Sequence, residues 1–210
     1  VNIDGFALPI KQLKGTEPVE SLDFSSKELG PASAIVIASL IGANPSLTTL
    51  IIYSNKLGDE GVGSIASALT ESTASQLESI DLRDNNIGSK GAESLAAWLA
   101  VTGSLTSIDL SDNALFPNGE VPSSSLIGDS LETGAKVRMN EVYDGELTVL
   151  KEANDEGNVH IGDPTGIQAI ADALRVTASL TSLQLSHNNL KNEGVSTICE
   201  TINCNTETKM

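Results

Sequence analysis

The stretch SLTSIDLSDN, residues 104–113, decides how this chain folds, because it recurs in closely similar form. The copies are SLTTLIIYSN at 46–55, QLESIDLRDN at 76–85 and SLTSLQLSHN at 179–188. Their leading leucines, at positions 47, 77, 105 and 180, lie 30, 28 and 75 residues apart. Self-similarity at a step of about 30 residues is typical of an array of stacked units, and the long third step indicates one interruption.

Each copy combines a strand with a helix. Ile80 and Leu82 alternate with polar residues, which indicates a short strand with one buried face. After Leu57 the apolar residues change to helical spacing, as Val62, Ile65, Ala66 and Leu69. A unit of about 28 residues cannot cover its own apolar face, so we expect the units to stack, with a parallel sheet inside and helices outside.

An asparagine follows the strand of four units, where the chain turns toward the helix. The shared pattern of leucines, aliphatic residues and this asparagine occurs at 47–57, 77–87, 105–115 and 180–190. A looser copy runs over 19–29, with Lys27 in place of the asparagine. A buried amide can pair with backbone groups that a turn would otherwise leave unpaired. We therefore predict a structural ladder formed by Asn55, Asn85, Asn113 and Asn188.

The segments LTTLIIYSNKLGDEGVGSIASAL and LESIDLRDNNIGSKGAESLAAWL resemble leucine-rich repeats, specifically the longer, helix-containing repeats of the ribonuclease-inhibitor type. The resemblance covers roughly residues 19–115 and 162–202. It implies an α/β solenoid shaped like a horseshoe, with the parallel sheet on the concave face and the helices on the convex face. It says little about function, because such scaffolds carry many different roles.

The interruption falls in the fourth unit, between its strand and its helix. After Leu115 the chain reads FPNGEVPSSS, a turn-rich stretch, and the missing helix follows only from Gly166, as GIQAIADALRVTAS. We predict an insertion over 116–161 at the rim, where extra chain disturbs no stacking contact. Its apolar runs and Tyr-Asp-Gly-Glu turn predict a β-hairpin or three-stranded meander, which resembles a small SH3-like barrel.

Four regions follow from these patterns. Residues 1–18 form an N-terminal cap, 19–115 carry repeats 1–4, 116–161 form the inserted β module, and 162–210 hold the helix of repeat 4, repeat 5 and the C-terminal end. The cap is expected to cover the first repeat with Phe6, Leu8, Ile10 and Leu13. No polar cap follows the fifth helix, so we expect either that the stack continues or that its last face meets a partner.

Composition limits the partners. The 12 basic and 28 acidic residues give a net charge of −16, which disfavours nucleic acid and anionic lipid and favours a protein with a basic or mixed surface. No apolar run is long enough to span a bilayer, so we expect no direct membrane insertion and a soluble, intracellular protein of the cytoplasm or an organelle. The start at Val1 rather than Met leaves a removed targeting peptide or a truncated chain open.

The concave face carries the candidate binding residues, because strand side chains alternate and every second one points away from the core. These residues are Ile51, Tyr53, Asp81, Arg83, Asp84, Asp109, Asp112, Gln184 and His187. Parallel strands lie about 4.8 Å apart, so Asp81 should neighbour Asp109, and Asp84 should neighbour Asp112. Such carboxylates repel unless Arg83 or an incoming cation compensates. Ile51 and Tyr53 are expected to be exposed apolar groups that contact a protein.

Catalytic, metal and cofactor sites are not indicated. His160 and His187 have no Cys or His at ligand spacing, and the glycine-rich GDEGVGS and IGSKG lack the order of a phosphate-binding loop, so they are interpreted as helix entries. Trp98 and Cys199 have the spacing of packing residues, the latter aligning with Ala66. Cys204 is expected to be a free thiol, and the position of both cysteines at the extreme C-terminus argues against a disulfide scaffold.

The leading hypothesis is a non-catalytic docking module or scaffold, as a peripheral subunit of a larger assembly, that binds proteins through the concave face, the insert or the C-terminal end. One alternative is a calcium-responsive module on the acidic strands. Another is an enzyme whose site lies in the insert and uses some of Glu141, Asp144, Glu146 and His160.

Overall fold

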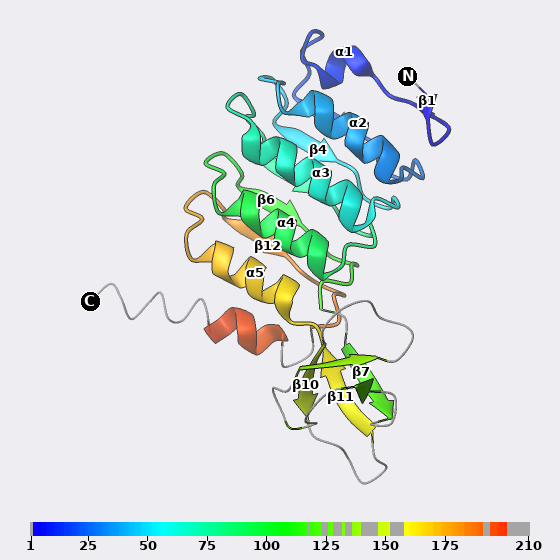
Figure 1. The fold of residues 1–210 in the computed structure, drawn as a ribbon. Helices are drawn as coiled ribbons and strands as arrows, with labels where there is room; N and C mark the ends of the chain where they lie inside the picture. The colour runs from blue at the N-terminus through cyan, green and yellow to red at the C-terminus, as the bar shows by residue number, and fades with distance from the viewer. Residues whose placement is uncertain are drawn as a thin grey trace, which may run out of the picture.

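The structure, a computed structural model, describes residues 2–116, 118–122, 126–127, 132, 136–139, 147–151, 158–190 and 194–200. Short parallel strands form one layer and helices form the other, so the predicted α/β solenoid is confirmed (Figure 1). The strands are β3 (Ser21–Asp23), β4 (Thr49–Ile51), β5 (Ser79–Asp81), β6 (Ser107–Asp109) and β12 (Ser182–Gln184). The helices are α2 (Pro31–Ile41), α3 (Gly58–Glu71), α4 (Ser89–Leu99) and α5 (Thr165–Leu174), followed by a helix over 194–200.

The parallel sheet has the order β12-β6-β5-β4-β3, with equivalent residues of neighbouring units side by side. Leu50 pairs with Ile80, and Ile80 pairs with Ile108. β12 lies directly beside β6, although its Ser182 follows the partner Ser107 by 75 residues. The residues between these two strands therefore leave the pairing of the sheet intact.

Aliphatic side chains from equivalent positions fill the space between sheet and helices. The inner strands and the residues just after them contribute Leu50, Ile52, Ile80, Leu82, Ile108 and Leu110, all buried. The helices contribute Val62, Ile65, Ala92, Leu95, Ile167 and Ile170, also buried. Each fully buried Leu or Ile contributes about 1.5–3 kcal/mol. Trp98 of α4 is only 3% exposed, as expected for a packing residue.

The glycines at the helix starts allow neighbouring helices to approach closely. Gly61 and Gly166 occupy equivalent positions in the first turns of α3 and α5. A Cβ atom on Gly166 would lie 2.7 Å from the Cα atom of Ser89, and one on Gly61 would lie 2.9 Å from the Cβ atom of Ala34. These distances are too short for real Cβ atoms, so the glycine-rich stretches serve packing at the helix entries, as their repetition indicated.

The asparagine amides join neighbouring units across the turns. Asn55 Nδ2 donates to the carbonyl oxygens of Phe24, Ile52 and Tyr53 at 2.8–3.0 Å. Its Oδ1 accepts from the backbone N–H groups of Lys27 and Leu29 at 3.1 and 2.9 Å. Asn113 and Asn188 also bond to a neighbouring unit with both ends of the amide.

Asn85 differs from the other three asparagines. Its Nδ2 donates to three carbonyl oxygens, but its buried Oδ1 has no hydrogen-bond partner among the described residues. In the facing turn, the N–H of Asn55 bonds to the carbonyl oxygen of Asp84, and the N–H of Gly58 bonds to that of Asn85. Gly58 adopts a left-handed backbone (φ 60°), so the turn before α3 takes a different path.

A small N-terminal hairpin precedes the first repeat. β1 (Asn2–Ile3) and β2 (Phe6–Ala7) are joined by Asp4 and Gly5, both with positive φ, and α1 (Ile10–Leu13) follows. Phe6 packs edge-on against Phe24 at 6.1 Å between ring centroids. The predicted cap residues Leu8 and Leu13 are buried, and Phe6 and Ile10 pack against the core.

The Asp4 carboxylate ties this hairpin to the start of α2. Its Oδ2 accepts from the Ser33 hydroxyl at 2.6 Å and from the Gly30 N–H at 2.9 Å. These hydrogen bonds, the Ser33 one first, lower the pKa of Asp4 below its ordinary value. The carboxylate also lies at the positive end of the helix dipole.

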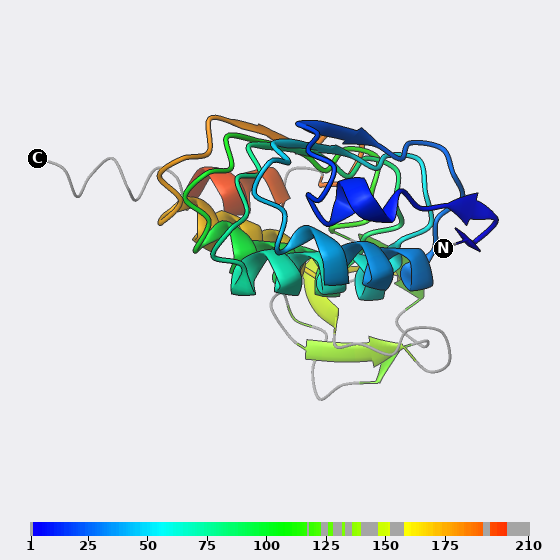
Figure 2. The same ribbon diagram turned by 90° about the horizontal axis from the view of Figure 1, so that it is seen from above.

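The segment between β6 and α5 contains antiparallel strands in the order β7-β11-β10-β9-β8. Their bounds are β7 (Asn118–Pro122), β8 (Leu126–Ile127), β9 (Lys136–Met139), β10 (Leu147–Lys151) and β11 (Asn158–Gly162). β10 pairs antiparallel with both β9 and β11, while β8 pairs with β9 and β7 pairs with β11 at the two edges. In Figure 2 these yellow-green strands lie beyond the helices, away from the parallel sheet. The inserted β module, its likeness to an SH3-like barrel and its boundaries stay predictions.

The expectation that Cys199 is buried is wrong, because Cys199 is exposed. Its helix also exposes half of Val195, whereas the equivalent Val62 of α3 is fully buried. In the inner units this flank of the helix is covered by the next helix along the solenoid. Among the described residues no helix follows 194–200. Cys204 lies outside the described residues.

No described helix has the length and apolar character to cross a membrane.

The asparagine bonds predict a graded loss of stability. Asn55→Ala removes donated and accepted hydrogen bonds, whereas Asn85→Ala removes only donated ones. Because each buried group left unpaired costs about 1–3 kcal/mol, Asn55→Ala should lower the free energy of unfolding by roughly 1 kcal/mol more than Asn85→Ala. Urea unfolding of both variants measures the difference, and an equal or larger loss for Asn85→Ala would contradict this description of the turns.

Asp4 predicts a pH dependence of the hairpin. Because the pKa of Asp4 is lower in the folded state, its contribution is present above the unfolded-state pKa of about 4 and is lost as the pH falls through the lowered value. Amide hydrogen exchange of residues 2–13 should therefore be slower in the wild type than in Asp4→Ala at pH 5. The difference should vanish at strongly acidic pH. A difference that persists there would show that the ionised Asp4 carboxylate does not hold the hairpin to the start of α2.

Candidate functional site

The outward side chains of the parallel strands form columns across the concave face. One column contains Asp23, Ile51, Asp81, Asp109 and Gln184. The next contains Ser25, Tyr53, Arg83, Ser111 and Ser186, two residues further along each unit. The structure thus brings together five predicted site residues on β4, β5 and β6 and in the residues that follow these strands, while Gln184 lies exposed at the edge of the sheet.

Arg83 is the centre of this group. Its Nε lies 2.9 Å from Asp81 Oδ1 and its Nη2 lies 2.6 Å from Asp81 Oδ2, which is a bidentate pair. The same Nε lies 3.3 Å from Asp109 Oδ2. The hydrogen bond to Asp81 is the main reason why the pKa of Arg83 is raised. Arg83 therefore supplies the compensating charge that the neighbouring carboxylates require.

Tyr53 lies against the same guanidinium group. The Arg83 Cζ atom is 4.9 Å from the centroid of the Tyr53 ring, within the range of a cation–π contact. Ile51 and Tyr53 were expected to be exposed, but both are half-buried. The residues of neighbouring units crowd them, and Arg83 covers part of the Tyr53 ring. The result is a surface that combines one aromatic ring, one guanidinium group and one aliphatic side chain.

The other predicted carboxylates lie at the turns, each with a partner. Asp84 Oδ2 accepts from the Ser54 hydroxyl at 2.9 Å. Asp112 Oδ1 lies 2.9 Å from His187 Nδ1, and both side chains are largely exposed. Asp84 and Asp112 occupy neighbouring turns, as expected. Asp84 bonds to Ser54 of the preceding unit, whereas Asp112 bonds to His187 of the following unit. All four side chains sit on residues with left-handed backbone, which presents them along one edge of the concave face.

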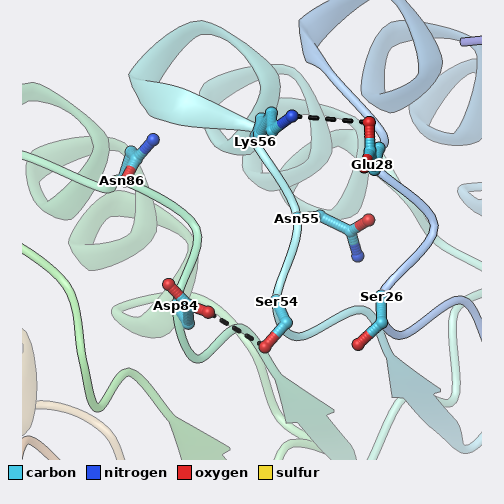
Figure 3. A pocket seen from close by; sticks show the side chains of 7 residues that line it. All are labelled: Ser26, Glu28, Ser54, Asn55, Lys56, Asp84 and Asn86. Atoms are coloured by element: carbon cyan, nitrogen blue, oxygen red, sulfur yellow. Dashed lines mark hydrogen bonds and ion pairs between the residues drawn. The ribbon is translucent and has the colours of Figure 1, made fainter.

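A polar pocket of about 450 Å³ opens at the first three turns (Figure 3). It is lined by Ser26, Glu28, Ser54, Asn55, Lys56, Asp84 and Asn86. Lys56 Nζ lies 3.5 Å from Glu28 Oε2, and both side chains are mostly exposed. The pocket was not anticipated from the sequence, although Asn and Ser clusters at turns are a signal for left-handed residues. Its charged groups are paired with one another or with hydroxyl groups, so it adds a polar border to the concave face.

No arrangement of the described residues supports the two alternatives that require a metal ion or a catalytic site. No group of three or more His, Cys, Asp or Glu side chains in this part of the chain is arranged to hold a metal ion. Asp81 and Asp109 are already bonded to Arg83. Glu141, Asp144 and Glu146 lie outside the described residues, as does the side chain of His160, so the enzyme hypothesis stays untested.

The comparison with known proteins agrees with this repeat geometry. A family described as Leucine Rich repeat matches residues 43–66, 75–96 and 178–199. The chain therefore carries leucine-rich repeats and is similar to ribonuclease inhibitors. The matched segments each contain a strand of the parallel sheet and the turn asparagine that follows it. The matched segments carry Tyr53, Asp81 and Arg83, whereas Asp109 lies outside them, on the neighbouring strand β6.

Relatives with similar sequences are much longer than this chain. Mouse ribonuclease inhibitor (Mus musculus) is 28% identical over 164 residues, and the pig protein (Sus scrofa) is 29% identical over 153 residues. The human protein "NACHT, LRR and PYD domains-containing protein 5" is 28% identical over 221 residues. These alignments cover 78%, 73% and 87% of the chain but only 32%, 32% and 18% of the relatives. The chain therefore spans a third or less of the relatives it matches.

Two solved structures share the fold. "Leiomodin-1 Actin-Binding Site 2 (ABS2)" superposes with a TM-score of 0.58 at 12% identity and covers 96% of this chain and 89% of that one. The tropomodulin C-terminal domain of Caenorhabditis elegans gives a TM-score of 0.57 at 11% identity and covers 95% and 92%. At such low identity the likeness concerns the fold alone.

The Arg83 cluster predicts a modest effect on stability. Arg83→Ala leaves Asp81 and Asp109 side by side without a counter-charge and should lower the free energy of unfolding by about 1 kcal/mol at low salt, because these groups are partly exposed. Added salt screens the repulsion and should reduce this loss. Arg83→Lys keeps the charge without the bidentate geometry and should fall in between. Urea unfolding at two salt concentrations measures both effects, and an Arg83→Ala variant as stable as wild type would contradict the role of Arg83.

Proposed function

We propose that the chain is a non-catalytic docking module that binds a partner protein through its concave face. The observation that supports this most is the stack of Tyr53 on Arg83, held in place by Asp81 and Asp109. Tyr and Arg are enriched among the residues that dominate binding energy at protein interfaces. An arginine that is already fixed by two carboxylates loses less conformational freedom on binding than a free one.

The charges around this stack favour a partner with a basic or mixed surface. Asp23, Glu28, Asp84 and Asp112 border the stack, against Lys27 and Lys56. The hydroxyl and N–H groups of Ser25 bond to Asp23 and lower its pKa, so this carboxylate stays ionised at neutral pH. The central trio of two aspartates and one arginine carries only one net negative charge. An apolar or aromatic group of the partner would therefore fit on Ile51 and Tyr53, with basic groups beside it.

The relatives support binding rather than catalysis. The mouse and pig relatives are named ribonuclease inhibitors, and the leiomodin-1 structure is described as an actin-binding site, so each name refers to contact with another protein. The chain matches only part of these inhibitors, and its likeness to leiomodin-1 is one of fold. Neither ribonuclease nor actin is therefore assigned as its partner. A role as a scaffold or as a peripheral subunit of an assembly belongs to the same proposal.

Affinity capture with matched variants tests the proposal. Immobilised wild-type chain, Tyr53→Ala and Ile35→Ala are incubated with the same extract of the source cells, and retained proteins are quantified by mass spectrometry. Ile35 is 44% exposed on α2, on the helical side, and serves as the control. A partner of the concave face should be retained by the wild type and by Ile35→Ala and fall about tenfold or more with Tyr53→Ala.

Reversal of charge gives an independent check. Asp84→Lys combined with Asp112→Lys should weaken retention of a basic partner and make it less sensitive to salt. If every protein retained by the wild type is retained equally by Tyr53→Ala and by the charge-reversed variant, the concave face is not the binding site.

A further inference from the structure

The concave face repeats the same side-chain positions at a fixed step from unit to unit. Neighbouring strands pair in register, so Asp81 lies beside Asp109 on one side and beside Ile51 on the other. Strands in such a sheet lie about 4.8 Å apart. A partner element that follows the stack therefore meets a new unit at every step of about this length. Figure 2 shows the face as an outer layer of the solenoid, with no described helix over it.

This step matches the turns of an α-helix and does not match an extended strand. A helix rises about 1.5 Å per residue, so residues three, seven and ten positions along one face lie about 4.5, 10.5 and 15 Å from the first. Three successive units lie about 4.8, 9.6 and 14.4 Å from the first one. Side chains on one face of an extended strand are about 6.7 Å apart and would fall behind by about 2 Å at every unit.

The width of the face also suits a helix. One side of it carries only short hydroxyl side chains, namely Ser21, Thr49, Ser79, Ser107 and Ser182. The other side is raised by the Tyr53 ring, with the Arg83 guanidinium 4.9 Å from its centroid. Thr49 and Tyr53 are four residues apart along one extended segment, or about 13 Å. An α-helix with its side chains is about 10–12 Å wide, so it fits between these two sides, over Ile51.

The charges on the face determine which residues such a helix would need. Asp23 in the first unit and Asp112 in the fourth unit are both exposed carboxylates. Between them, Arg83 offsets one of the two negative charges that it binds. Ile51 and Tyr53 provide an apolar contact in the second unit. A complementary helix therefore carries a basic residue near each end and an apolar residue close to one of them.

We propose, on the basis of the docking function above, that the element bound by the concave face is a basic, amphipathic α-helix of the partner protein. Its axis runs along the stack, across β3, β4, β5 and β6, between the hydroxyl side chains and Tyr53. An apolar side chain contacts Ile51 and Tyr53, and basic side chains lie over Asp23 and Asp112. These two carboxylates are three units apart, about 14 Å, which corresponds to about ten residues of a helix but only about four residues of an extended chain.

A phage-displayed library of random peptides of about 16 residues tests this, because it favours no secondary structure in advance and its members are long enough to cross the sheet as a helix. The immobilised whole chain and its Tyr53→Ala variant are used in parallel. Peptides retained by the wild type and lost with Tyr53→Ala should carry two Lys or Arg residues about ten positions apart. Leu, Ile or Met should follow or precede one of these by three or four positions.

A selected peptide is then synthesised, and its affinity is measured by fluorescence anisotropy. In double-mutant cycles, Asp23→Lys should couple to one basic residue of the peptide and Asp112→Lys to the other, and each variant should weaken binding about tenfold or more. Glu93→Lys is the matched control, because Glu93 is exposed on α4, on the helical side, and its reversal should leave the affinity unchanged. Circular dichroism confirms that the variants are folded.

A proline in the middle of the peptide should weaken binding at least about tenfold, because it breaks a helix. Peptides that require Tyr53 but show four-residue spacing of their basic residues, or that tolerate the proline, would overturn the helix proposal and leave the docking function standing. A library from which no peptide is retained would overturn the helix proposal as well. Peptides that bind the wild type and Tyr53→Ala equally would instead contradict the docking function of the concave face.

Discussion

The molecule depends on one constraint: a single strand-and-helix unit cannot remove its own apolar residues from water. Leu50, Ile80 and Ile108 are buried because each lies between equivalent residues of its neighbours. The turn asparagines add the same dependence for polar groups, since the Asn55 amide bonds to the backbone of the preceding unit. Val195 lies in the last unit that the structure describes, and it is half exposed.

The same stacking creates the candidate binding face. Parallel strands in register place equivalent side chains next to one another, so a residue of one unit meets its neighbours' residues at a fixed distance. Arg83 therefore reaches Asp81 of its own unit, Asp109 of the next unit and Tyr53 of the preceding one. The left-handed turns then present Asp84, Asp112 and His187 along the border. We propose that the binding function is carried by the side chains at these few positions of the repeated scaffold.

Much of the repeat architecture could be predicted from the sequence, because alternation at Ile80 and Leu82 and helical spacing at Val62 and Ile65 are local signals. The sequence also predicted which residues the strand register brings together, such as Asp81 and Asp109. The burial of Cys199 was predicted wrongly because burial depends on a following unit rather than on the local pattern. The contact between Tyr53 and Arg83 depends on side-chain rotamers, which periodicity does not determine. The N-terminal hairpin was missed, although Asp4-Gly5 is a hairpin signal.

The most direct test of this account asks whether neighbouring units stabilise each other. Ile108→Ala creates a cavity in β6, in the middle of the stack, and residue-resolved hydrogen exchange then reports the local stability of every strand. The account predicts that protection falls in β5 and β12 as well as in β6, with β3 affected least, because stability is passed between nearest neighbours. A loss of protection confined to β6 would contradict it.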